Sequence, residues 1–178
     1  MKQRKRVVIT GASSGIGQAA AVRFAQEGWD VCLVARRETL LQEVLGQLPP
    51  GNHVVCAGSY DDPKTTRRLE QILEEKWQSV DALVNNAGVF MTANVVASPL
   101  QTWREPFDIM IRGAVLTTRT VVPLMPDGGR IIHVTSIHGE RAEKGSSSYA
   151  MAKAALNQYC RGLALELAPR NILVNALA

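Results

Sequence analysis

The stretch Thr10-Gly11-Ala12-Ser13-Ser14-Gly15-Ile16-Gly17 directly follows the apolar run Arg6-Val7-Val8-Ile9 and precedes an amphipathic segment that extends to about Gly28. This order predicts a strand, a tight glycine turn and a helix. Gly11 permits the sharp turn, Gly15 lets a phosphate approach the backbone, and Gly17 lets the helix pack closely on the strand. The free N–H groups at a helix N-terminus bind phosphates. A plain strand-to-helix turn is the alternative, but the flanking strand and helix favour a nucleotide-binding loop.

Short β-branched runs alternate with longer amphipathic stretches through the rest of the chain. Further strands are expected over 30–35, 53–57, 80–85 and 130–135 and from 172 onward, and further helices over 38–48, 63–77, 102–125 and 149–168. Pro106 is tolerable only near the first turn of its helix. Continuous apolar strands separated by helices predict a doubly wound, three-layer α/β fold of Rossmann type, with a parallel sheet in a single domain over residues 1–178. Ligands of such sheets bind beyond the carboxyl ends of the strands.

The chemistry-bearing residues follow those strands. The loop spacing is Gly-x-x-x-Gly-x-Gly, and with Thr10 it resembles the cofactor motif of the short-chain dehydrogenase/reductase family. The run Asn85-Asn86-Ala87-Gly88 is similar to the family's Asn-Asn-Ala-Gly motif, although alone it is only a turn signal. Ser136, Tyr149 and Lys153 match the family triad in order, spacing and element type. The resemblance covers nearly the whole chain and implies hydride transfer between a nicotinamide cofactor and a carbonyl or secondary alcohol.

The expected catalytic residues are Ser136, Tyr149 and Lys153. Tyr149 and Lys153 are four residues apart on a predicted helix and therefore share one face. A nearby ammonium favours the phenolate form, which makes tyrosine a usable acid/base near neutral pH. The Ser136 hydroxyl can polarise the substrate oxygen. A Tyr-x-x-x-Lys pair arises often by chance, so this assignment depends on Ser136 and on the glycine loop.

The end of the second strand bears on the choice of cofactor. Ala35 is followed by Arg36 and Arg37, where an NAD site would place a carboxylate on the ribose 2′-hydroxyl. A guanidinium can instead bind a 2′-phosphate, as Arg36 would by resemblance to the family, with Ser13 adding a hydroxyl. We therefore predict NADP(H); the alternative is that both arginines only solvate a helix start. The predicted cofactor-binding residues are Gly11, Ser13, Ser14, Gly15, Ile16, Gly17, Arg36, Arg37, Asn86, Ala87, Gly88, Tyr149 and Lys153.

Two features depart from the family pattern. Met110 stands three residues before Gly113, where family members usually carry an Asn that holds a water beneath the lysine, and a thioether is only a weak acceptor. The sequence ends at Ala178, so we expect the family's Pro-Gly turn, substrate lid and last strand to be absent. Two interpretations stay open: an active reductase or dehydrogenase, and a catalytically weak or inactive nucleotide-binding or scaffolding member of the same fold.

Several further residues near the expected site have two interpretations each. His133 lies in an apolar strand, which favours a core position over catalysis. His138 follows Ser136 by two residues and can reach the substrate, and Phe90 and Met91 either line the pocket or simply pack. Ser59 stands where the family often has an Asp that contacts adenine, and that contact is left open. The substrate cannot be deduced, because its specificity is expected in 137–148 and beyond residue 178.

Composition limits the class of protein. The net charge of +4 comes partly from the basic start, and without interleaved aromatics this start favours a solvated flank over a nucleic-acid arm. The three cysteines have no zinc or disulfide spacing, so we expect free thiols, a reducing compartment and no metal site. No apolar run approaches the roughly 20 residues that span a bilayer. We expect a cytoplasmic protein with a small-molecule substrate and no nucleic-acid or membrane partner, and the family implies a homo-oligomer, a dimer or tetramer. The residues concerned are Lys2, Arg4, Lys5, Arg6, Cys32, Cys56 and Cys160.

Overall fold

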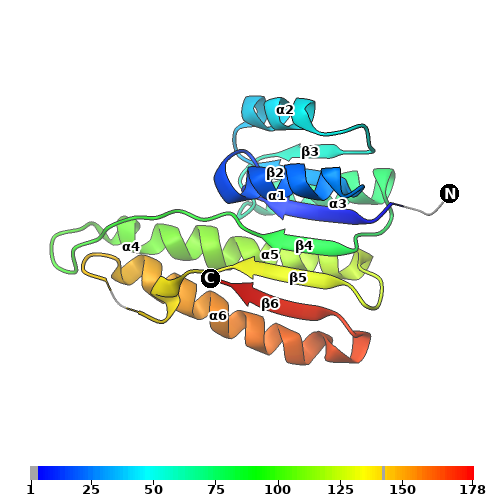
Figure 1. Ribbon diagram of the computed structural model, residues 1–178. Coiled ribbons are helices and arrows are strands. Elements are labelled where there is room, and N and C mark those ends of the chain that lie inside the picture. The colour runs from blue at the N-terminus through cyan, green and yellow to red at the C-terminus, as the bar shows by residue number, and fades with distance from the viewer. Residues whose placement is uncertain (1–3, 142) are drawn as a thin grey trace.

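The computed structural model of the protein describes residues 4–141 and 143–178, so that Lys2 lies outside the described residues, and centres on one parallel sheet (Figure 1). Its six strands are β1 (Arg6–Thr10), β2 (Asp30–Ala35), β3 (Val54–Ala57), β4 (Ala82–Asn85), β5 (Arg130–Val134) and β6 (Leu173–Leu177). They are ordered β3-β2-β1-β4-β5-β6, and every neighbouring pair is parallel. The expected doubly wound α/β fold is confirmed.

Helices cover both faces of the sheet. On one face lie α1 (Gly15–Gln26) and α2 (Glu38–Gln47), and on the other lie α3 (Pro63–Lys76), α5 (Gly113–Val121) and α6 (Ser147–Leu167), as Figure 1 shows. Successive side chains of a strand point to opposite faces. In β1, Val7 and Ile9 accordingly pack in the α1/α2 core while Val8 packs in the opposite core. This burial of both faces explains why the strand sequences are continuously apolar.

The prediction of one regular helix over 102–125 is wrong. The segment divides into α4 (Leu100–Phe107), a π-helical turn η1 (Asp108–Arg112), α5 and a 3-10 turn η2 (Val122–Leu124). Pro106 lies in the last turn of α4 instead of the first turn, and it offers no N–H to the helix. The Gly113 N–H donates to Asp108 O, five residues back, instead of Ile109 O. The Ile109 carbonyl therefore does not accept from the Gly113 N–H, and it accepts a hydrogen bond from the Tyr60 side chain outside the helix.

The remaining elements differ from expectation only at their ends. α6 begins at Ser147, so Tyr149 lies in its first turn, and β6 extends to Leu177 at one edge of the sheet. Two short 3-10 turns, η3 (Ile137–Gly139) and η4 (Ala168–Arg170), complete the chain. Within the described part of the chain, no helix is both long enough and apolar enough to cross a membrane.

Candidate active site

The glycine loop joins β1 to α1 at the carboxyl edge of the sheet. Gly11 has φ of 69°, and its N–H donates to Val34 O at 2.8 Å. At Gly17 a β-carbon would lie 2.3 Å from Gly11 O, so only glycine lets the helix approach this closely. At Gly15, where φ is 57°, a β-carbon would meet no atom within 4 Å. The loop thus packs on itself at Gly11 and Gly17 and faces open space at Gly15.

The residues after β4 are bound to the end of β1. The Thr10 hydroxyl accepts from the N–H groups of Asn86 and Ala87 at 3.0 and 3.1 Å, and Asn86 Nδ2 donates to Thr10 O at 3.0 Å. Asn85 is buried beneath them and donates to Thr118 Oγ1 at 3.2 Å. These bonds fix Asn86 and Ala87 against the glycine loop, and both residues line the same cleft.

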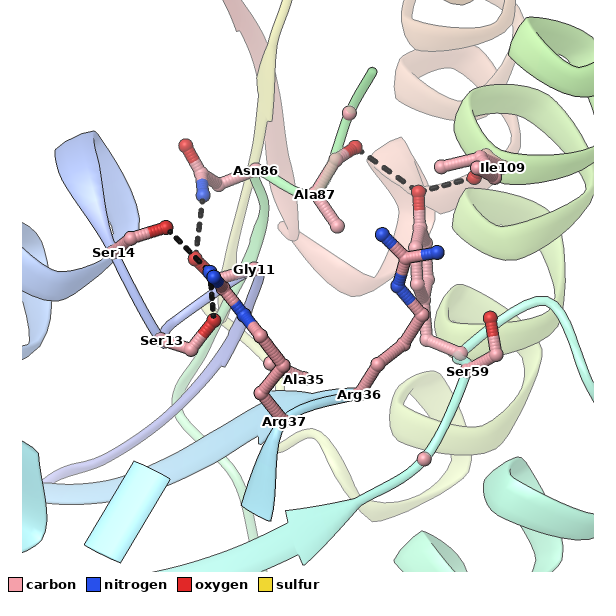
Figure 2. A pocket seen from close by; sticks show the side chains of 13 residues that line it. Gly11, Ser13, Ser14, Ala35, Arg36, Arg37, Ser59, Asn86, Ala87 and Ile109 are labelled. Carbon is pink, nitrogen blue, oxygen red and sulfur yellow. Dashed lines mark hydrogen bonds between the residues drawn. The ribbon is translucent and has the colours of Figure 1, made fainter. Parts of the chain in front are cut away.

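A cleft of about 220 Å³ lies over the carboxyl ends of β1, β2 and β4 (Figure 2). Figure 2 shows Arg37 pointing toward the glycine loop and Arg36 toward the Ile109 side of the cleft. Arg37 Nη2 donates to the hydroxyls of Ser13 and Ser14 at 3.2 and 3.1 Å. The lining residues are Gly11, Ser13, Ser14, Ala35, Arg36, Arg37, Gly58, Ser59, Tyr60, Asn86, Ala87, Gly88 and Ile109. Of the residues expected to bind a cofactor, Gly15, Ile16, Gly17, Tyr149 and Lys153 are not among these.

Tyr60 and Ile109 are cleft residues that sequence reasoning missed. Tyr60 is buried, and its one hydroxyl hydrogen is shared between two carbonyl acceptors, Ala87 O at 3.0 Å and Ile109 O. Burial raises the pKa of this phenol. Its ring packs on Gly113, where a β-carbon would lie 2.3 Å from a ring carbon. The position of Tyr60 in the sequence could have indicated it, because Tyr60 follows β3 at the carboxyl edge of the sheet, next to Ser59, which the sequence analysis considered.

Lys153 lies at the end of β5, beside Tyr149. Its side chain is 4% exposed, and Nζ donates to Val134 O, the last carbonyl of that strand, at 2.8 Å. The ammonium lies 5.6 Å from the centre of the Tyr149 ring. Burial lowers the pKa of Lys153 to about 8. The structure therefore brings this expected pair together and ties it to the strand that leads into Ser136.

Ser136 caps the 3-10 turn η3. Its Oγ accepts from the His138 N–H at 3.2 Å, which leaves the hydroxyl hydrogen available for another acceptor. The rings of Phe90, His138 and Tyr149 form an aromatic cluster, with centroids separated by 5.0 Å for Phe90–Tyr149 and 5.9 Å for His138–Tyr149. His138 is also paired with Glu143 at 3.2 Å. His138 and Phe90 thus pack against the ring of Tyr149.

His133 lies in the core, away from this edge. It is 0% exposed, its Nδ1 is 3.4 Å from Asn85 Nδ2, and its ring meets that of Tyr159 at 5.4 Å between centroids. Burial lowers the pKa of His133 to about 4. Among residues 4–141 and 143–178, no three His, Cys, Asp or Glu side chains come together as a metal site.

Known proteins resemble the chain along almost all of its length. A family model described as short chain dehydrogenase matches residues 5–178. An uncharacterized oxidoreductase of Staphylococcus saprophyticus is 33% identical, over 99% of this chain and 77% of the relative. L-Sorbose reductase from Gluconobacter frateurii, solved with NADPH and L-sorbose, has a TM-score of 0.92 at 32% identity, over 98% of this chain and 68% of that one. A 3-ketoacyl-(acyl-carrier-protein) reductase from Brucella melitensis, solved with NADH, has a TM-score of 0.90 at 28% identity, over 97% and 74%.

Proposed function

The chain belongs to the short-chain dehydrogenase family of oxidoreductases, and we propose that it transfers a hydride between NADP(H) and a carbonyl or secondary alcohol, with Tyr149 as the acid/base. One observation supports this most strongly. Gly88 lines the nucleotide cleft, and a β-carbon on it would lie 3.7 Å from Lys153 Nζ. Gly88 therefore borders both the cleft and the Lys153 ammonium, so a cofactor bound along the cleft would lie close to this lysine.

The residues of the cleft fit a dinucleotide. The open space at Gly15 and the N-terminus of α1 suit a pyrophosphate, because free N–H groups and the helix dipole favour negative charge there. Gly11, Ser13, Ser14, Asn86 and Ala87 would line the remainder of the cofactor. When bound, the nicotinamide ring supplies or accepts the hydride.

The preference for NADP(H) follows from charge. β2 ends at Ala35 and not at a carboxylate, and two exposed guanidinium groups follow it. Arg37 already bonds two serine hydroxyls of the glycine loop, so these three side chains form a ready set of donors for a 2′-phosphate. Arg37 therefore shares with Arg36 the contact that the sequence suggested for Arg36. Of the two solved relatives described above, one was solved with NADPH and the other with NADH. The preference for NADP(H) over NAD(H) is therefore proposed from the two arginines of this chain.

The chemistry at the substrate is assigned to three side chains. In the direction of reduction, Tyr149 gives its hydroxyl proton to the carbonyl oxygen as the carbonyl carbon receives the hydride. The Lys153 ammonium stabilises the phenolate that forms. The Ser136 hydroxyl, whose oxygen already accepts from the His138 N–H, donates a hydrogen bond to the same carbonyl oxygen and keeps its proton. Reversal of these steps oxidises an alcohol.

Cofactor titration and turnover test the proposal together. Protein fluorescence should show tighter binding of NADPH than of NADH, and Arg37→Glu should weaken NADPH about tenfold or more while leaving NADH nearly unchanged. Turnover of NADPH with a panel of ketones and aldehydes should fall about 100-fold or more in Tyr149→Phe. A preference for NADH would refute the cofactor assignment. Tight NADPH binding without turnover of any carbonyl would favour the alternative of a nucleotide-binding protein that does not catalyse.

Location and assembly complete the proposal. We place the protein in the cytoplasm, because its three cysteines are free and buried, as in a reducing compartment.

We also propose a homo-oligomer, a dimer or tetramer. Val95, Val96 and Leu100 support this, since these apolar side chains are strongly exposed near the start of α4.

A further inference from the structure

The Lys153 ammonium occupies a nearly closed niche. Its Nζ donates to Val134 O, which is its only acceptor among residues 4–141 and 143–178. Met110 is 1% exposed and packs beside Gly88, which lines the cleft. A β-carbon on Gly88 would be 3.4 Å from Met110 Sδ and 3.7 Å from Lys153 Nζ. The thioether and the ammonium therefore both lie beside the Gly88 backbone.

The π-turn and Tyr60 hold Met110 in this place. Met110 is the middle residue of η1, and the carbonyl before it, that of Ile109, accepts a hydrogen bond from the Tyr60 hydroxyl. The same hydroxyl bonds Ala87 O, the carbonyl before Gly88. One buried phenol thus clamps together the two backbone segments that carry Met110 and Gly88. π-Turns inside helices are frequent at functional sites.

We propose that Met110 is a positioning residue for Lys153: its thioether fills the space beside the ammonium, keeps water out, and leaves Val134 O to orient the lysine toward Tyr149. Methionine suits this task because it is flexible, apolar and only a weak acceptor. The inference rests on the proposed function, in which Lys153 stabilises the Tyr149 phenolate. It adds that the pKa of the Lys153 ammonium is set by a residue that touches neither substrate nor cofactor.

The charge state of Lys153 follows from the niche. Desolvation disfavours the charged form of a lysine, and burial is the only cause of its lowered pKa. The groups that surround it are the Tyr149 phenol from α6, Met110 from η1, the Gly88 backbone and the Val134 carbonyl. His138, from η3, faces the Tyr149 ring and pairs with Glu143. In the described part of the chain no carboxylate raises the pKa of Lys153, so no nearby negative charge opposes the effect of burial beside Met110.

A polar and an apolar replacement of similar shape test the proposal. Met110→Gln brings an amide acceptor and its water into the niche, whereas Met110→Leu keeps the niche apolar. The Lys153 pKa is measured in the cofactor-free protein by carbon NMR of labelled lysine side chains, with Lys153→Arg to assign the signal. We expect a pKa of about 8 in the unchanged protein and in Met110→Leu, and a rise toward 10.5 in Met110→Gln.

Two outcomes would overturn the proposal: a Lys153 signal that titrates near 10.5 in the unchanged protein, or equal pKa values in Met110→Gln and Met110→Leu. Should Met110→Gln fail to fold by circular dichroism, Met110→Ala, which opens a space that water can enter, should raise the pKa in the same direction. The NMR readout needs no substrate. Failure of the proposed function would appear instead as absent NADPH binding or absent turnover with the lysine pKa still low.

Discussion

The two halves of the sheet build their parts of the site by different means. In the half formed by β1, β2 and β3, the glycine loop is shaped by backbone contacts: Gly17 packs on Gly11, and Gly15 faces open space. In the half formed by β4, β5 and β6, the site is made of side chains that reach across the fold. Lys153 bonds the end of β5 from α6, and Tyr60 bonds the π-turn from the loop after β3.

The covering of the sheet differs in the same way. β1 and β2 are buried almost throughout, whereas in the edge strand β6 only Val174 is buried, and Leu177 is 59% exposed. A backbone site needs rigid packing around it, and the first half has helices on both faces. The second half positions chemistry by single hydrogen bonds. Changes in the first half should therefore act on folding and cofactor binding at once, while changes in the second half should separate the two.

Gly17→Ala should produce the largest loss of stability. The new β-carbon would lie 2.3 Å from Gly11 O and 2.5 Å from Asn86 Nδ2, so the loop or the helix must move. We expect a loss of roughly 4 kcal/mol in the free energy of unfolding, above the usual overpacking cost of about 1–3 kcal/mol because one contact is with backbone. Urea unfolding followed by circular dichroism measures it.

Gly15→Ala is the matched control within the same loop. No protein atom lies near its β-carbon, so the cost is the positive φ alone, about 1–2 kcal/mol. The methyl group would nevertheless occupy the space proposed for the pyrophosphate, and NADPH affinity should fall strongly. Equal stabilities of the two alanine variants would contradict the division of the loop into a packed and an open part.

In the second half, His133 should make stability depend on pH. Its folded pKa of about 4 lies below its ordinary 6.5, so the unfolded chain binds a proton first. This contribution is complete above pH 6.5 and is lost as the pH falls through 4, amounting to about 3 kcal/mol at about 1.4 kcal/mol for each pKa unit. Urea unfolding at pH 7 and pH 4, compared between the protein and His133→Leu, isolates it from the carboxylates. A parallel pH dependence in both proteins would exclude this role.

The same division explains what the sequence could predict. The alternation of strands and helices, the glycine loop and the arginines after Ala35 follow from local patterns, and the structure places the loop and the arginines at one edge of the sheet. The π-turn has no local signature beyond Pro106, because the helix pattern itself continues through it. Tyr60 was missed for a related reason: its partners, Ala87 O and Ile109 O, are backbone atoms 27 and 49 residues away. Backbone acceptors freed by tertiary structure leave no trace in residue types.

Thr10 joins the two halves, and its replacement tests this junction directly. Thr10→Val keeps the shape but removes the oxygen that accepts from the Asn86 and Ala87 N–H groups. The Ala87 N–H then loses its acceptor, whereas the Asn86 N–H keeps Val84 O at 3.1 Å, and the loss should cost about 2 kcal/mol. Thr10→Ser keeps the oxygen and loses one methyl group, about 1 kcal/mol. Because Asn86 and Ala87 line the cleft, Thr10→Val should also weaken NADPH binding, and Thr10→Ser should not. If both variants unfold at the same urea concentration and bind NADPH equally, the hydroxyl does not couple the halves, and the junction depends on the Asn86 side chain alone, through its bond to Thr10 O.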